Sequence, residues 1–309
     1  SGSASGGNST STTGPVTWQD GWGQMPFSAH PKVDAQGHLC NIGGGVSNRG
    51  LAVYHVGPNG KLVDARTVKL PLDAERTGGM LHDMAVTDRH IVVPIPPVVI
   101  RWDRILRGQI GHDSMALTKN EPLRIWAAPK DALDHGRFFE LPGEMVFHVG
   151  NAHDEGDEVV LSYVGNPGPD FLGGTAVNRM RGELGQPGGG KGRSELRLAR
   201  LNLRTGKVQL DTLAAGSETE FPRVDPRQVG LPARWLVMPA SWGTPRGALQ
   251  FDGVQVADAR SGAVQRFDYG ADFMPEEHIV VPRPGSSTEF DAWLLATAYH
   301  LPSKRHCVN

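Results

Sequence analysis

The stretch Glu195-Leu-Arg-Leu-Ala-Arg-Leu-Asn-Leu203 places leucines at alternate positions, first at 196 and 198 and then at 201 and 203. Successive side chains of a β-strand point to opposite faces, so this spacing predicts a strand. Arg204-Thr-Gly206 follows with turn residues, and Lys207–Leu213 resumes a β-type pattern. We therefore expect these two segments to pair as a hairpin.

Similar short segments recur through the chain, each bounded by turn residues, and 40 glycines and 23 prolines are consistent with many turns. Only Pro129–His135 suggests a turn or two of helix. Short antiparallel strands without a long helix predict an all-β barrel, sandwich or propeller. The further expected strands are Leu51–Val56, His90–Pro94, Glu158–Val164, Trp235–Met238 and Trp293–Tyr299.

Bulk composition excludes several functions. A net charge of −2 gives no basic excess to neutralise a phosphate backbone, so nucleic acid is not an expected partner. The two cysteines, Cys40 and Cys307, form no CxxC or Cys/His motif, which favours a reducing, cytoplasmic setting over a disulfide framework. Residues 1–14 are rich in Ser, Gly and Thr and are expected to be a flexible leader or cloning remnant, leaving 15–309 as one β-domain.

Three of the twelve histidines lie in compact motifs beside β-type segments: His30, His82 and His148. Any one of them alone is better explained as a hydrogen-bonded core histidine. Together, histidines that converge from different strands are how a β-scaffold builds a metal site, and imidazole suits Zn, Cu, Fe and Ni. Surface exposure is the default expectation for His38, His55, His90, His112, His135 and His300.

Two carboxylates are candidates to orient such histidines. A metal-bound histidine usually donates its second ring N–H to a carboxylate or carbonyl group. Glu220 and Glu277 both lie in motifs of this kind. The alternative for Glu220 is an ordinary ion-pair cluster with Arg223, and spacing alone does not reject it.

Five motifs together resemble the carotenoid cleavage oxygenase family, which includes lignostilbene dioxygenases and the retinoid isomerase of the eye. They follow the family's order across residues 28 to 291, which makes the match much more specific than any single motif. The motifs are Ser28-Ala-His-Pro-Lys-Val-Asp34, Leu81-His-Asp-Met-Ala-Val-Thr87, Phe147-His-Val-Gly-Asn-Ala152, Glu220-Phe-Pro-Arg-Val-Asp225, and Glu277-His-Ile-Val-Val-Pro-Arg-Pro-Gly285 followed by Glu289-Phe-Asp291.

This resemblance implies a seven-bladed β-propeller with Fe²⁺ on its axis, held by four histidines. It implies that His30, His82 and His148 are iron ligands, and that Glu220 and Glu277 orient ligand histidines. The implied reaction inserts O₂ across a conjugated C=C bond of an apolar polyene and releases two carbonyl products. Peripheral membrane contact is a further expectation, because polyenes partition into lipid.

The match covers nearly all of this chain but only the middle of a full family member. The family has many more residues before its first histidine motif, and its fourth ligand follows the fifth motif. His300 and His306 lie outside any such motif and are not assigned as ligands. The propeller is therefore expected to be partial in this chain.

Three other functions stay open at this stage. A stilbene-cleaving enzyme of the same family is the nearest alternative, because the residues that separate the two branches lie outside this segment. A non-catalytic propeller is the second, supported by the missing fourth histidine. A zinc hydrolase is the third and weakest, since it would need a general base near three histidines.

Overall fold

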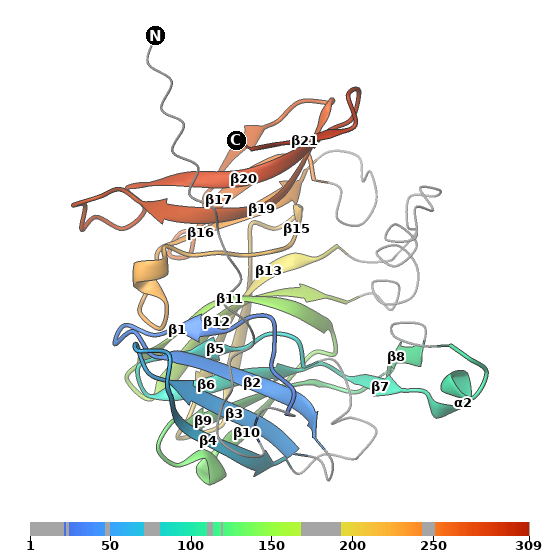
Figure 1. Cartoon of the computed structure of the whole chain (residues 1–309), viewed down its shortest axis with the longest axis vertical. Coiled ribbons are helices and arrows are strands. Elements are labelled where there is room, and N and C mark those ends of the chain that lie inside the picture. Colours follow the sequence, from blue (N-terminus) through green and yellow to red (C-terminus); the bar gives the residue numbers. More distant parts are fainter. Residues whose placement is uncertain are drawn as a thin grey trace.

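The computed structural model describes residues 22, 25–46, 50–70, 81–109, 114–118, 120–167, 193–242 and 251–308. Nearly all of the regular structure is antiparallel β-sheet, which confirms the expected all-β class. The strands form four sheets of four strands, one of three, and a two-stranded arm. Figure 1 shows the sheets following one another in chain order, from blue to red. The leader at residues 1–14 lies outside the described residues.

Each sheet is built from a continuous run of chain. The first contains β1 (Lys32–Val33), β2 (Leu39–Val46), β3 (Gly50–Val56) and β4 (Leu62–Lys69). The second contains β5 (Ala85–Val86), β6 (His90–Ile95), β9 (Leu123–Pro129) and β10 (Arg137–Leu141). The third contains β11 (Met145–Glu155), β12 (Glu158–Asn166), β13 (Glu195–Asn202) and β14 (Val208–Leu213).

The fourth sheet contains β15 (Glu218–Thr219), β16 (Trp235–Ser241), β17 (Gly253–Asp258) and β18 (Val264–Asp268). The fifth contains β19 (Phe273–Pro282), β20 (Ala292–His300) and β21 (Arg305–Val308). An arm of β7 (Val98–Ile100), α2 (Trp102–Ile105) and β8 (Met115–Leu117) interrupts the second sheet and projects from the body (Figure 1). Two short 3₁₀ turns, η2 (Leu133–His135) and η3 (Pro226–Gln228), complete the described elements.

The expected hairpin and strands are confirmed. Strands β13 and β14 pair antiparallel, with Leu196 opposite Leu213. The expected helical turn is found as η2, whereas α2 was not expected. Helix α2 has only four residues, too few for a periodic signal in the sequence.

The sheets pack face to face because their strands are apolar on both faces. In β6, Val93 belongs to the core shared with the first sheet, whereas the adjacent Val92 belongs to the core shared with the third. In β13, Leu201 faces the second sheet and Leu196 faces the fourth. A strand buried on both faces gives a nearly continuous apolar run, as in β6. The described helices are all short, and none could cross a lipid bilayer.

One sheet face of this kind is exposed. On the fifth sheet, Ile279 pairs across the strands with Leu295, and Val281 pairs with Trp293. All four side chains are largely accessible, with Trp293 49% exposed. This face corresponds to the faces that the other sheets bury against a neighbour.

The two cysteines should react very differently. Both are free thiols, but Cys40 is buried, and burial raises its pKa to about 11. At pH 8 roughly one Cys40 in a thousand is then a thiolate, which is the reactive form. We expect iodoacetamide to label the partly exposed Cys307 in the native protein and Cys40 only after unfolding, as read by peptide mass spectrometry. Native labelling of Cys40 at a similar rate would contradict this packing.

The carboxylate of Asp154 ties the third sheet to the second and should make stability pH-dependent. It accepts hydrogen bonds from His90 Nδ1 at 2.6 Å and from the Arg89 backbone N–H at 3.0 Å. Burial alone would raise its pKa, but these bonds outweigh burial and hold the pKa below its ordinary value of 3.8. The contribution to stability is therefore present above that value and is lost as the pH falls.

We expect Asp154→Asn to lower the free energy of unfolding by about 1–3 kcal/mol at pH 7. The difference from the parent protein should shrink below about pH 4, as measured by urea titration at several pH values. Asp157→Asn is the matched control, because Asp157 pairs with Arg204 on the surface and both side chains are largely exposed. A deficit for Asp154→Asn that is constant with pH would contradict the assignment.

Candidate metal centre

The first strands of four sheets, β1, β5, β11 and β19, line a common cavity, whose position we call the axis. This cavity of about 290 Å³ is lined by Lys32, Ala85, Gly150 and Ile279 from these strands, and by Val224 from the segment between β15 and β16. Each predicted histidine precedes such an inner position by two or three residues in the sequence. The chain therefore brings His30, His82 and His148 to the same end of three successive sheets.

The structure places these three histidines together. Their candidate ligand atoms all lie within 4.8 Å of one another. The Nε2 atoms of His30 and His82 are 2.9 Å apart, and the His30 and His148 rings have centroids separated by 4.8 Å. His148 is buried, and the other two are half-buried. His30 and His82 are 52 residues apart in the sequence, and His82 and His148 are 66 apart, so the packing of the sheets brings them together.

An irregularity in β11 directs His148 toward the axis. The pairing of β11 with β12 shifts register between Val146 and Val149 and again between Val149 and Asn151. A β-bulge of this kind re-aims a side chain and is common beside functional sites. Gly150 fits closely in this segment, because a Cβ there would lie 2.7 Å from the Ser162 hydroxyl and 2.8 Å from a Leu236 methyl, so one of these side chains would have to shift.

Glu220 fixes the orientation of His148. The buried Glu220 Oε2 lies 2.7 Å from His148 Nδ1 and also accepts the backbone N–H of Phe221 at 2.7 Å. A carboxylate can only accept here, so Nδ1 carries the proton and Nε2 keeps a lone pair for a metal. Phe221 has a backbone φ of 51°, an unusual value for a bulky residue, and its ring packs 4.6 Å from that of His148.

Two residues that the sequence reasoning missed hold the histidine loops together. The buried Asp83 accepts the Val149 backbone N–H at 2.8 Å and forms an ion pair with Lys32 at 2.7 Å, so it connects three sheets next to His82. Ser28 donates from its hydroxyl to the His82 carbonyl at 2.6 Å. Asp83 could have been noticed, because it is a charged residue beside His82 in an otherwise apolar segment.

The surroundings of His30 favour its neutral form. Burial is the largest cause and lowers its pKa below the ordinary value. The negative charge of Asp83 opposes this shift, while the positive charges of Lys32 and Arg223 add to it. A neutral imidazole is the form that binds metal ions.

Glu277 is placed differently from Glu220. It lies at a register shift in β19, between Pro275 and His278, and forms an ion pair with Arg223 of the fourth sheet. Within the described residues, its hydrogen bond is to this arginine rather than to any of the three clustered histidines. Its predicted role in orienting a ligand histidine stays a prediction.

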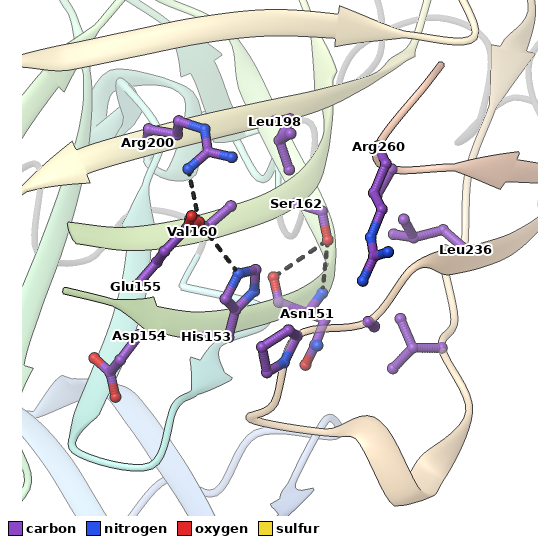
Figure 2. Close-up of a pocket in the computed structure, with 14 residues that line it drawn as sticks. Asn151, His153, Asp154, Glu155, Val160, Ser162, Leu198, Arg200, Leu236 and Arg260 are labelled. Carbon is purple, nitrogen blue, oxygen red and sulfur yellow. Dashed lines mark hydrogen bonds and ion pairs between the residues drawn. The ribbon is translucent and has the colours of Figure 1, made fainter. Parts of the chain in front are cut away.

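A larger cavity of about 500 Å³ lies away from these histidines, between the third and fourth sheets (Figure 2). Its polar lining includes Asn151, His153 and Arg260, and none of the three clustered histidines contributes to it. Burial lowers the pKa of His153. Among the described residues, this cavity therefore does not include the cluster of three histidines.

The three histidines fit a divalent transition metal. Two imidazole nitrogens bound at right angles to a metal about 2.1 Å away would lie roughly 3 Å apart, close to the observed 2.9 Å between His30 and His82. All three donors are imidazoles, and the buried carboxylate lies one shell outside them. The set therefore suits Zn, Cu, Fe, Co or Ni and is poorly suited to Ca²⁺ or Mg²⁺, which prefer oxygen ligands.

Comparison with known proteins gives the family. Residues 8–308 match the family described as retinal pigment epithelial membrane protein. This chain belongs to that family. Its members include the carotenoid cleavage oxygenases, so the resemblance drawn from the five motifs is confirmed.

Several family members show the likeness. The chain is 28% identical to carotenoid 9,10(9',10')-cleavage dioxygenase 1 of Phaseolus vulgaris, covering 89% of this chain and 50% of that protein. It is 26% identical to apocarotenoid-15,15'-oxygenase of Synechocystis, covering 89% and 55%. The chain thus spans about half the length of the curated relatives it matches.

Solved structures support the fold. Cobalt-substituted Synechocystis ACO superposes with a TM-score of 0.78 at 22% identity, covering 91% of this chain and 58% of that one. Lignostilbene dioxygenase of Pseudomonas brassicacearum superposes with a TM-score of 0.75 at 22% identity, covering 93% and 61%. The five sheets therefore have the arrangement of a carotenoid oxygenase propeller, as expected.

The two predicted carboxylates should contribute unequally to metal affinity. We expect Glu220→Gln to weaken the binding of a divalent transition metal at the three histidines by about 10-fold or more, because it removes the charge that orients and polarises His148. Glu277→Gln is the matched control, and we expect about a two-fold effect or less, since Glu277 pairs with Arg223 at a half-exposed site. Anaerobic equilibrium dialysis with Fe²⁺ measures both. Equal losses would show that Glu277 also acts on a ligand.

Proposed function

We propose that this chain binds Fe²⁺ through His30, His82 and His148, with Glu220 orienting His148. The observation that carries the proposal is the convergence of three imidazoles from three sheets on one axis, with one held by a buried carboxylate. Bound iron would supply a position at which O₂ can bind and be activated. The hydrogen bonds of Asp83 and Ser28 hold the segments that carry the histidines in place. Burial lowers the pKa of His30 and so favours its neutral, metal-binding form.

The proposed reaction is cleavage of a conjugated C=C bond in a carotenoid or apocarotenoid. Both atoms of O₂ enter the products, one on each carbon of the broken bond, so two carbonyl compounds form and no other reductant is needed. Support comes from relatives that are named carotenoid and apocarotenoid oxygenases. Phe147 and Phe221 pack on His82 and His148, and their apolar rings would shield the ligands from water beside an apolar substrate.

A stilbene is the second candidate substrate. Its support is the likeness to lignostilbene dioxygenase, which extends to the fold. The carotenoid reading is favoured because the relatives that match at 26–28% identity are carotenoid and apocarotenoid enzymes. We further propose a cytoplasmic protein with peripheral membrane contact, on the ground that an apolar polyene must be drawn from lipid.

The test couples metal analysis to product analysis. Protein purified without oxygen should bind about one iron per chain and, when O₂ is admitted, should convert an apocarotenoid into two carbonyl products. His82→Ala should lose most of the iron and the products. His306→Ala is the control, because His306 is exposed and outside the cluster, and it should behave as the parent protein.

Each alternative result has a distinct meaning. Iron binding without cleavage of either a carotenoid or a stilbene would overturn the oxygenase assignment and favour a non-catalytic metalloprotein. Cleavage of the stilbene but not of the carotenoid would identify the chain as a stilbene-cleaving enzyme instead. Absence of iron from the parent chain, or equal loss in both histidine variants, would overturn the assignment of the ligands.

A further inference from the structure

A second group of metal-binding residues lies in the first sheet, away from the axial histidines. It consists of Asp34, His38 and His55, whose candidate ligand atoms all lie within 4.8 Å of one another. Asp34 and His38 lie at the two ends of the turn between β1 and β2, and His55 lies in β3. Sequence patterns predict no special role for His38 or His55 and predict that both are exposed, but in the structure both are half-buried.

The carboxylate of Asp34 is held in a fixed position. Its side chain is only 5% exposed. Oδ1 accepts the backbone N–H groups of Gln36 and His38, each at 3.0 Å, and Oδ2 lies 3.1 Å from the Lys130 ammonium group. A carboxylate has about four lone-pair positions. Three are used here, which leaves one on Oδ2 for a further partner.

The two imidazoles lie beside this carboxylate. The rings of His38 and His55 have centroids 4.6 Å apart and are tilted by 51°. His38 Nδ1 lies 3.7 Å from Asp34 Oδ1, beyond hydrogen-bond range. Donor atoms around a zinc ion at 2.0–2.2 Å are roughly 3.4 Å apart, so modest side-chain rotations would bring these groups to coordinating distances.

We propose that Asp34, His38 and His55 form a second metal site, for a divalent transition metal of the zinc class. Two imidazole nitrogens and one carboxylate oxygen are a donor set that Zn²⁺ and Co²⁺ accept, with water completing the coordination shell. The site is independent of the axial histidines. It would link the β1–β2 turn to β3 and so stabilise the edge of the first sheet.

Lys130 gives this site a recognisable property. Its ammonium group comes from the end of β9 in the second sheet and contacts the same Asp34 oxygen that a metal would use. Lysine and metal are both cations and compete for one carboxylate. Removing the lysine charge should therefore tighten metal binding, whereas adventitious binding to surface histidines would not respond in this way.

The test is anaerobic equilibrium dialysis of the purified chain against Co²⁺ and, separately, Zn²⁺, with metal counted per chain. His148→Ala is also used as a background, so that loss of the axial site does not obscure the second one. We expect His55→Gln to lower the count by one metal per chain in both backgrounds, or to weaken that binding step at least ten-fold. His38→Gln, which changes a turn residue rather than a strand residue, should have the same effect, and circular dichroism verifies folding.

Two further variants test the assignment. His135→Gln alters an exposed histidine outside the cluster and should leave the count unchanged. Lys130→Gln should tighten the second binding step several-fold. A count that is unaffected by His55→Gln and His38→Gln, or that falls equally with His135→Gln, would overturn the site. Unchanged or weaker binding in Lys130→Gln would remove Asp34 as a ligand and overturn the three-residue site.

Discussion

The sheets of this protein are apolar on both faces, and this constraint decides how the chain is arranged. A sheet with two apolar faces gains the full hydrophobic contribution only when it has a neighbour on each side. Val92 and Val93 of β6 point to different neighbours and are both fully buried. The four contacts between successive sheets follow from this rule. The exposed pair of Trp293 and Leu295 on the fifth sheet follows from it as well, because that face has no neighbour in the described chain.

The same packing creates the candidate metal centre. Sheets that pack face to face bring their first strands close together, so residues in or next to these strands can reach the same place. His30 and His82 lie just before the first strands of two sheets, His148 lies within the first strand of the third, and Glu220 directly follows β15 of the fourth. Polar groups near an axis need partners, and Asp83 supplies several of them by bonding to Lys32 and to the Val149 backbone. The Asp83 carboxylate thus holds three sheets together and at the same time fixes the segments that carry the three histidines.

The two proposed metal sites differ in how they depend on the fold. The axial histidines come from three sheets and can meet only when those sheets have docked. Asp34, His38 and His55 lie within one sheet, where a turn and a strand pairing bring them together. Binding at the axis would therefore stabilise the whole arrangement of sheets, whereas binding at the second site would act mainly on the first sheet. Thermal unfolding followed at each site should separate these two contributions.

The sequence by itself determined the strands, the hairpin of β13 and β14, the family, and three histidines worth testing. These features are local patterns or ordered motifs, so they can be recognised in the sequence without knowing how the side chains pack. Only the tertiary structure decided that Glu220 pairs with His148, that Glu277 pairs with Arg223 and that Asp83 joins three sheets. It also decided that His38 and His55 are half-buried beside Asp34. Such contacts depend on side-chain direction and on bulges in β11 and β19, where a single extra residue changes what a side chain meets.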